Sequence, residues 1–170
     1  MNLKKLTVII CIIWIAIISF WVIKSEYILN TGREVLLKTV PVDPRDLLMG
    51  DYVILNYEIS QIPEEYLYMV NKNYKNKEVY VVLKTDNNNI AVIDKMLYKE
   101  PREPFYIKGK ISKCNTANPF WKTGICINYG IESYYVKENT GMDLERNLRN
   151  GALVKIRIDR HGNAKVVGFV

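Results

Sequence analysis

The hydrophobic pattern of the chain changes sharply after its first two dozen residues. Residues 6–23 carry no charge, and twelve of them are Leu, Ile, Val or Phe. As an α-helix, which rises about 1.5 Å per residue, this run would be about 27 Å long, close to the roughly 30 Å hydrocarbon core of a bilayer. A globular helix of this length would show a polar face, and this run has none. Residues 6–23 are therefore predicted to be a transmembrane helix.

A cleaved signal peptide is the alternative for this segment. Signal peptides have a shorter apolar region, followed by small residues at the cleavage site. Here the run ends in Trp21 and other large side chains, which favours a retained anchor. Lys4 and Lys5 precede the run. By the positive-inside rule, residues 1–5 are expected in the cytoplasm and the rest of the chain outside, in a single-pass protein of the cell membrane.

Beyond a predicted linker at 24–33, the chain alternates between apolar and polar residues with the period of β-strands. The runs predicted as strands are 34–40, 52–59, 78–84, 90–97, 105–111, 125–131, 152–158 and 164–170. Two short helices are also predicted, at 63–72 and 142–149. Eight or nine strands in one domain over 34–170 predict a mainly β fold, either a sandwich or a partly open barrel.

Two of these strands carry more detailed expectations. Within 52–59, Val53, Leu55, Tyr57 and Ile59 share the face that is expected to be buried. Residues 78–84 are apolar enough to be covered on both faces, and the turn cluster at 85–89 predicts a hairpin to the next strand.

The charge of the chain is mild. It has 24 Lys and Arg against 18 Asp and Glu, so removing Lys4 and Lys5 leaves 22 against 18, a charge of +4 for the remainder. The basic residues form no stripe, and nucleic-acid binding is not expected. The expected partners are the membrane, through the helix, and another membrane or envelope protein.

The cysteines allow one disulfide. Cys11 lies in the predicted membrane helix, where a thiol behaves as a small apolar group. Cys114 and Cys126 fall on the same face of two neighbouring predicted strands. They could form a disulfide in an oxidising compartment, or remain two thiols on one face, because the sequence does not give the distance between their Cα atoms.

Recognisable catalytic and metal sites are missing from the sequence. His161 is the only histidine, and it lies in a predicted turn, so neither a nucleophile–histidine site nor a zinc site is well supported. The turn at 85–89 lacks the spaced acidic ligands of a calcium loop. No catalytic residue, metal or cofactor is assigned.

Two motifs stand out. Gly50, Asp51, Tyr52, Leu55 and Tyr57 occupy the positions of a GDYxxLxY signature. The second motif, at 129–136, reads Tyr-Gly-Ile-Glu followed by an aromatic-rich strand. Together they resemble the GDYxxLxY family of membrane-anchored bacterial proteins of unknown function. This resemblance implies a membrane segment followed by a β-rich domain, and it implies no activity.

Charged residues crowd the first motif. Asp43, Arg45 and Asp51 lie in a short segment that follows Pro41, and Arg45 is expected to pair with an Asp or with Glu132. These residues either brace a loop or form a recognition surface. The candidate binding residues are Asp43, Arg45, Asp51, Tyr52, Tyr57, Tyr129, Glu132 and Tyr134.

A weaker similarity links 42–53 to the motif layout of type I signal peptidases. Val42 stands at the position of the nucleophile, and Lys84 could stand at that of the general base. A lysine base without a serine performs no acylation, so this similarity implies a non-catalytic relative. The sequence thus favours a membrane-anchored extracytoplasmic binding or organising module, and the alternative is a hydrolase or an inactive relative on a signal-peptidase-like β fold.

Overall fold

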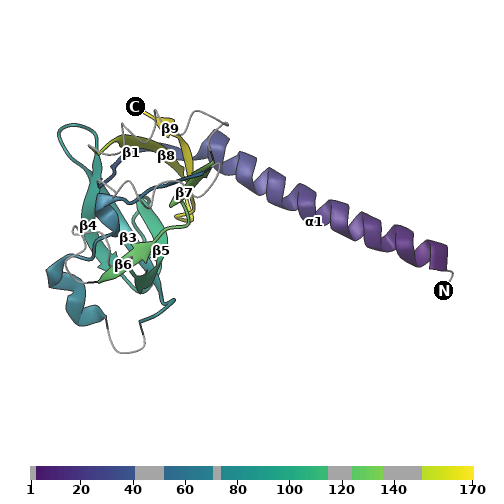
Figure 1. Cartoon of the computed structure of the whole chain (residues 1–170), viewed down its shortest axis with the longest axis horizontal. Helices are drawn as coiled ribbons and strands as arrows, with labels where there is room; N and C mark the ends of the chain where they lie inside the picture. The colour runs from purple at the N-terminus through teal and green to yellow at the C-terminus, as the bar shows by residue number, and fades with distance from the viewer. Residues whose placement is uncertain (1–2, 41–51, 71–73, 115–123, 136–150) are drawn as a thin grey trace.

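A long helix leaves one side of a β domain in the computed structural model, which describes residues 3–40, 52–70, 74–114, 124–135 and 151–170 (Figure 1). Helix α1 (Leu3–Thr31) is long and apolar enough to cross a membrane, and the apolar stretch is not buried against the domain. A signal sequence near an N-terminus can also meet this criterion of length and composition. The helix continues to Thr31, so the segment 24–33, predicted as a linker, is mostly helical.

The last turn of α1 is fixed to the domain. Ile28 is only 4% exposed, and the Arg157 guanidinium donates a hydrogen bond to the Leu29 carbonyl oxygen. A cation at a helix C-terminus satisfies unpaired carbonyl groups and complements the helix dipole. The chain then turns at Gly32, where a Cβ would lie 2.5 Å from the Ile28 carbonyl oxygen. The helix is therefore joined to the domain by packed contacts, which explains why the expected linker is not observed.

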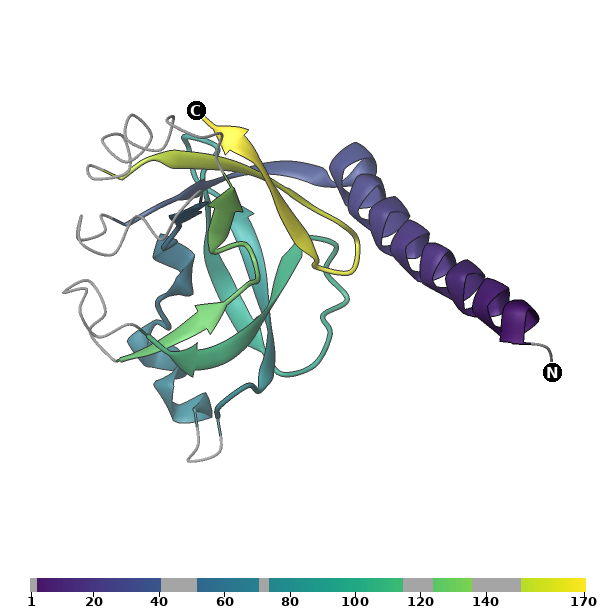
Figure 2. The ribbon, with the colours of Figure 1, turned by 45° about the vertical axis from the view of Figure 1, so that its right-hand side comes forward.

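The described residues form nine strands in three antiparallel sheets, which confirms the predicted mainly β class. The sheets have the orders β1-β8-β9, β2-β7 and β4-β3-β5-β6. Figure 2 shows them curving around a common interior. The strands are β1 (Arg33–Lys38), β2 (Tyr52–Ile54), β3 (Glu78–Thr85), β4 (Ala91–Leu97), β5 (Tyr106–Lys113), β6 (Ile125–Asn128), β7 (Ser133–Tyr135), β8 (Leu153–Ile158) and β9 (Ala164–Phe169).

The buried faces follow the predicted pattern. Val53, Leu55, Tyr57 and Ile59 are all buried, as the alternation in 52–59 predicts. Strand β3 buries 81–83 as three consecutive residues, so it is covered on both faces, and its hairpin with β4 is also as predicted. One core connects all three sheets.

Two predicted elements differ in type from those observed, and a third is not among the described residues. The run 52–59 is a strand only to Ile54, where its pairing with β7 ends at Ser133, and it continues to the 3₁₀ helix η1 (Glu58–Ser60). The predicted helix 63–72 is a 3₁₀ helix, η2 (Glu64–Met69), with the Tyr66 N–H donating to the Pro63 carbonyl. The predicted helix 142–149 lies outside the described residues.

Candidate functional site

The two sequence motifs lie side by side as strands β2 and β7. Val53 pairs with Tyr134 in their antiparallel register, and the Leu55 N–H donates to the Glu132 carbonyl oxygen at 2.7 Å. The Tyr134 ring packs edge-on against Phe169 of β9, with ring centroids 5.1 Å apart. The paired motifs therefore form a junction between strands that belong to different sheets.

Two tyrosines fasten the motifs to each other in a reciprocal way. The Tyr57 hydroxyl donates to the Ile131 carbonyl at 2.8 Å, and the Tyr129 hydroxyl donates to the Ile59 carbonyl at 2.7 Å. Tyr57 is 0% exposed and Tyr129 7% exposed. Burial, and then the nearby Glu132 carboxylate, raises the pKa of both phenols, so both remain protonated donors. These two candidate binding residues lie in the core, where their hydroxyls hold the motifs together.

Glu132 closes the turn between the strands β6 and β7. Gly130 adopts a positive φ of 78°, which glycine tolerates, and the half-buried Glu132 carboxylate accepts the Tyr129 N–H. Burial raises the pKa of Glu132, while hydrogen bonds from the backbone of 129–132 lower it, and the net shift is upward. The carboxylate thus takes up backbone donors of its own turn.

The raised pKa of Glu132 predicts a pH effect on stability. The folded state binds this proton more tightly than the unfolded state, for which the ordinary pKa is 4.5. The stabilisation from protonation is complete below pH 4.5 and is lost as the pH rises through the folded pKa. In urea unfolding across this range, wild type should gain stability relative to Glu132→Gln as the pH falls. A difference that does not vary with pH would contradict the shift.

Comparison with known proteins agrees with the paired motifs. Residues 14–169 match the family described as GDYXXLXY protein. The chain belongs to the GDYXXLXY family. Neither the curated proteins nor the solved structures contain a significant match to the chain.

Of the remaining candidate residues of this GDYXXLXY protein, the structure describes only some. Tyr52 lies in β2, opposite Tyr135 of β7. Asp43, Arg45 and Asp51 lie outside the described residues, so their predicted cluster with Glu132 stays a prediction.

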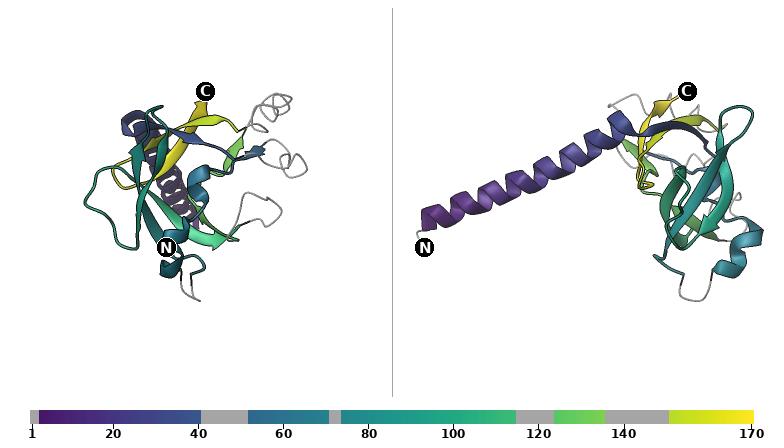
Figure 3. Two further views of the ribbon diagram at one scale, coloured as in Figure 1. Left: turned by 90° about the vertical axis from the view of Figure 1, so that its left-hand side faces the viewer. Right: turned by 180° about the vertical axis from the view of Figure 1, so that it is seen from behind.

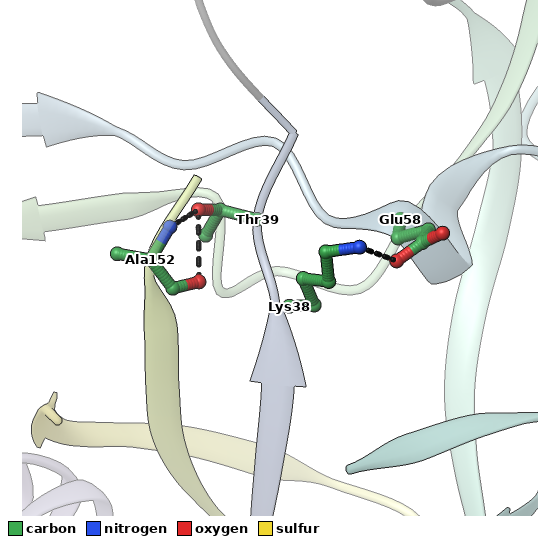
Figure 4. A network of polar contacts seen from close by, with 4 residues as sticks. All are labelled: Lys38, Thr39, Glu58 and Ala152. Carbon is green, nitrogen blue, oxygen red and sulfur yellow. Dashed lines mark hydrogen bonds and ion pairs between the residues drawn. The ribbon is translucent and has the colours of Figure 1, made fainter. Parts of the chain in front are cut away.

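A threonine clasp holds the chain just before the first motif. The Thr39 hydroxyl accepts the Ala152 N–H at 2.8 Å and lies 3.0 Å from the Ala152 carbonyl oxygen, to which it donates (Figure 4). The Thr39 N–H also donates to that carbonyl, at 2.9 Å. Next to the clasp, Lys38 and Glu58 form an exposed ion pair at 3.4 Å, which contributes little to stability. The clasp thereby places residues 40 and 151 side by side.

Cys114 and Cys126 form a disulfide, with their Cα atoms 5.1 Å apart. This is the bridged one of the two states that the sequence allows. The disulfide borders a polar hollow of about 180 Å³, which is also lined by Asn56, Ser60, Ser112, Asn128 and Glu132. Ser60 is 4% exposed, and its hydroxyl has no hydrogen-bond partner among the described residues. The hollow is a concave polar surface at the motif junction.

The sequence did not single out the serines and asparagines of this hollow. Asn56 fills an unspecified position within the first motif and Ser60 follows the motif, so neither is a signature residue. Ser112 lies opposite Cys126 and Asn128 lies opposite Lys110, so the two reach the hollow together only through the pairing of β5 with β6. The single available signal was the shared face of the two cysteines, which marks one wall of the hollow.

The comparisons do not support the weaker similarity to type I signal peptidases. Lys84, at the position suggested for a general base, is exposed and forms an ion pair with Asp94 at 3.2 Å. A lysine base is held in a desolvated pocket, and this lysine lies in solvent. Val42 lies outside the described residues. Over the described ranges no three His, Cys, Asp or Glu side chains gather as metal ligands, and His161 is exposed in the β8–β9 turn.

Proposed function

We propose that the protein is a single-pass, membrane-anchored binding module whose β domain lies outside the cytoplasm. The observation that carries this proposal is the contrast within α1. Its apolar side chains from Leu6 to Ile23 are exposed all round, while Ile28 in its last turns is buried against the domain. Such an apolar surface is stable in lipid and not in water.

The disulfide supports the placement of the β domain on the outer side of the membrane. Structural disulfides persist in oxidising compartments and are rare in the cytosol. The bridge between Cys114 and Cys126 joins residues whose Cα separation is in the usual range for disulfides. Together with Lys4 and Lys5 before the helix, it favours a cytoplasmic N-terminus and an external domain.

A binding role is favoured over catalysis by the state of those polar groups of the two motifs that the structure describes. The hydroxyls of Tyr57 and Tyr129 and the carboxylate of Glu132 are used by backbone partners. What remains at the junction is a concave polar surface, held at a fixed position relative to the anchor by the contacts of Arg157. We infer that the partner is another membrane or envelope protein, which meets the domain close to the membrane.

The location is tested by labelling with a membrane-impermeant maleimide. In a Cys11→Ala background, Tyr68→Cys places a thiol at an 82% exposed position of the domain, and Asn2→Cys places one before the helix. In intact spheroplasts Tyr68→Cys should be labelled fully, and Asn2→Cys only after permeabilisation. The opposite pattern would reverse the orientation, and a mature mass that lacks residues 1–23 would remove the anchor.

The binding half of the proposal is tested on the same membranes by crosslinking and purification. A partner should co-isolate with the wild type and with Lys75→Ala, an exposed-lysine control, and be lost from Arg45→Ala. Equal recovery with all three proteins would remove Arg45 from the recognition surface.

A further inference from the structure

Three basic residues gather where α1 enters the domain. Arg33 is the first residue of β1, two positions after the helix, and it pairs with Ile158 at the end of β8. Arg160 follows two residues later in the β8–β9 turn, and Lys165 of β9 pairs with Arg157, the residue that bonds the helix end. The strand register therefore places Lys165 beside Arg157, on the sheet face that meets the helix end, and Arg33 beside Ile158 at the strand end next to the β8–β9 turn.

Side-chain contacts bind this region together. The Arg33 guanidinium lies 4.0 Å from the centre of the Phe105 ring, and the neighbouring Tyr106 hydroxyl lies 3.3 Å from the Arg160 carbonyl oxygen. Figure 2 and the right panel of Figure 3 show the β8–β9 strands on the side of the domain from which α1 leaves. A membrane crossed by α1 would therefore face this side.

These basic residues are not neutralised by ion pairs. Arg33, Arg160, Lys165 and Lys24 of the helix form none with the described residues, whereas Glu34, the nearest acid on β1, is engaged by Lys155 and Arg157. Three further acids lie nearby: Glu26, which accepts from Asn30, Glu100, which accepts from Tyr106, and Asp159, whose carboxylate accepts the backbone N–H groups of its own turn. Four basic groups against three acidic ones leave the surface positive.

The length of α1 places this surface near lipid headgroups. From Ile23, the end of the uncharged run, to Thr31 the helix rises about 12 Å. The headgroup layer is roughly 5–8 Å thick on each side of the hydrocarbon core. The domain therefore begins a few ångströms above the headgroups, within the Debye length of about 8 Å at physiological ionic strength.

We propose that Lys24, Arg33, Arg160 and Lys165 form a basic rim that binds anionic lipid headgroups and holds the domain against the membrane surface. The proposal rests on the membrane anchoring proposed above and not on the identity of any protein partner. Helix α1 holds the protein in the bilayer, and the basic rim makes the protein prefer anionic lipids.

The test uses the full chain reconstituted in bilayers of phosphatidylcholine and phosphatidylglycerol, with spin-labelled forms of both lipids. The wild type should prefer phosphatidylglycerol, because each basic residue near an anionic surface adds up to about fivefold in affinity at low salt. The variant R33Q/R160Q/K165Q should lose most of this preference, as should the wild type in 0.5 M salt. Arg160→Gln alone, in a surface turn, should show a partial loss if the triple variant does not fold.

The matched control is K75Q/K77Q/K113Q, which removes three exposed lysines. They lie just before the start of β3 and at the end of β5, at the ends of these strands away from the basic rim. It should keep the wild-type preference. Equal loss in both triple variants would attribute the selectivity to net charge and overturn the rim. An inserted wild type without any lipid preference would also overturn it, whereas protein extracted from the bilayers by carbonate would overturn the anchoring itself.

Discussion

Replacing Tyr57 by Phe is expected to lower the free energy of unfolding by about 1–3 kcal/mol, because a buried carbonyl then loses its donor. The Tyr57 hydroxyl reaches the Ile131 carbonyl inside the core, and the ring itself stays in place in the variant. Tyr129→Phe should have a similar cost through the Ile59 carbonyl. Urea unfolding of the full chain in mild detergent, read by pulse proteolysis, measures both.

The matched control is Tyr68→Phe, since Tyr68 is 82% exposed. A surface change of this kind should stay within about 0.5 kcal/mol of wild type. The double variant Y57F/Y129F should not be additive, because both bonds join the same two segments. If Tyr57→Phe and Tyr68→Phe unfold at the same urea concentration, the hydroxyl bonds do not hold the junction.

Loss of the disulfide is expected to cost about 3 kcal/mol, from the entropy that a closed loop of this length removes from the unfolded chain. The bridge spans a sequence separation of 12, between the end of β5 and the start of β6. Cys114→Ser and Cys126→Ser should therefore each lower the unfolding midpoint, and reduction of the wild type should do the same.

The third cysteine supplies the control for this experiment. Cys11→Ser changes an exposed helix thiol far from the domain and should leave the unfolding of the domain unchanged. Full alkylation of Cys114 and Cys126 without reductant, in protein isolated from its native membrane, would contradict the bridge. A reduced wild type as stable as the oxidised protein would show that the bridge contributes no stability.

The GDYXXLXY motif has a structural explanation in the positions that are described. Leu55 and Tyr57 are both fully buried, and the second motif supplies the carbonyl that Tyr57 binds. The motif therefore builds the junction between the sheets.

The sequence by itself determined the elements whose signals are local. The uncharged run of residues 6–23 predicts the helix, and the two-residue alternation identifies the strands and the buried face of 52–59. The shared face of Cys114 and Cys126 made a bridge feasible. The two motifs, in their order along the chain, pointed to the family, because recognising a motif requires only the identity and spacing of its residues.

The tertiary structure decided everything that depends on contacts between distant residues. The segment 24–33 is mostly helical because Ile28 and Arg157 dock it on the domain, and no pattern within 24–33 contains Arg157. The reciprocal bonds of Tyr57 and Tyr129 join residues that are 74 and 70 positions apart. From the sequence alone, both tyrosines could equally belong to an exposed recognition surface. A tyrosine hydroxyl forms the same hydrogen bonds in the core and at a surface, so only the packing around it distinguishes the two roles.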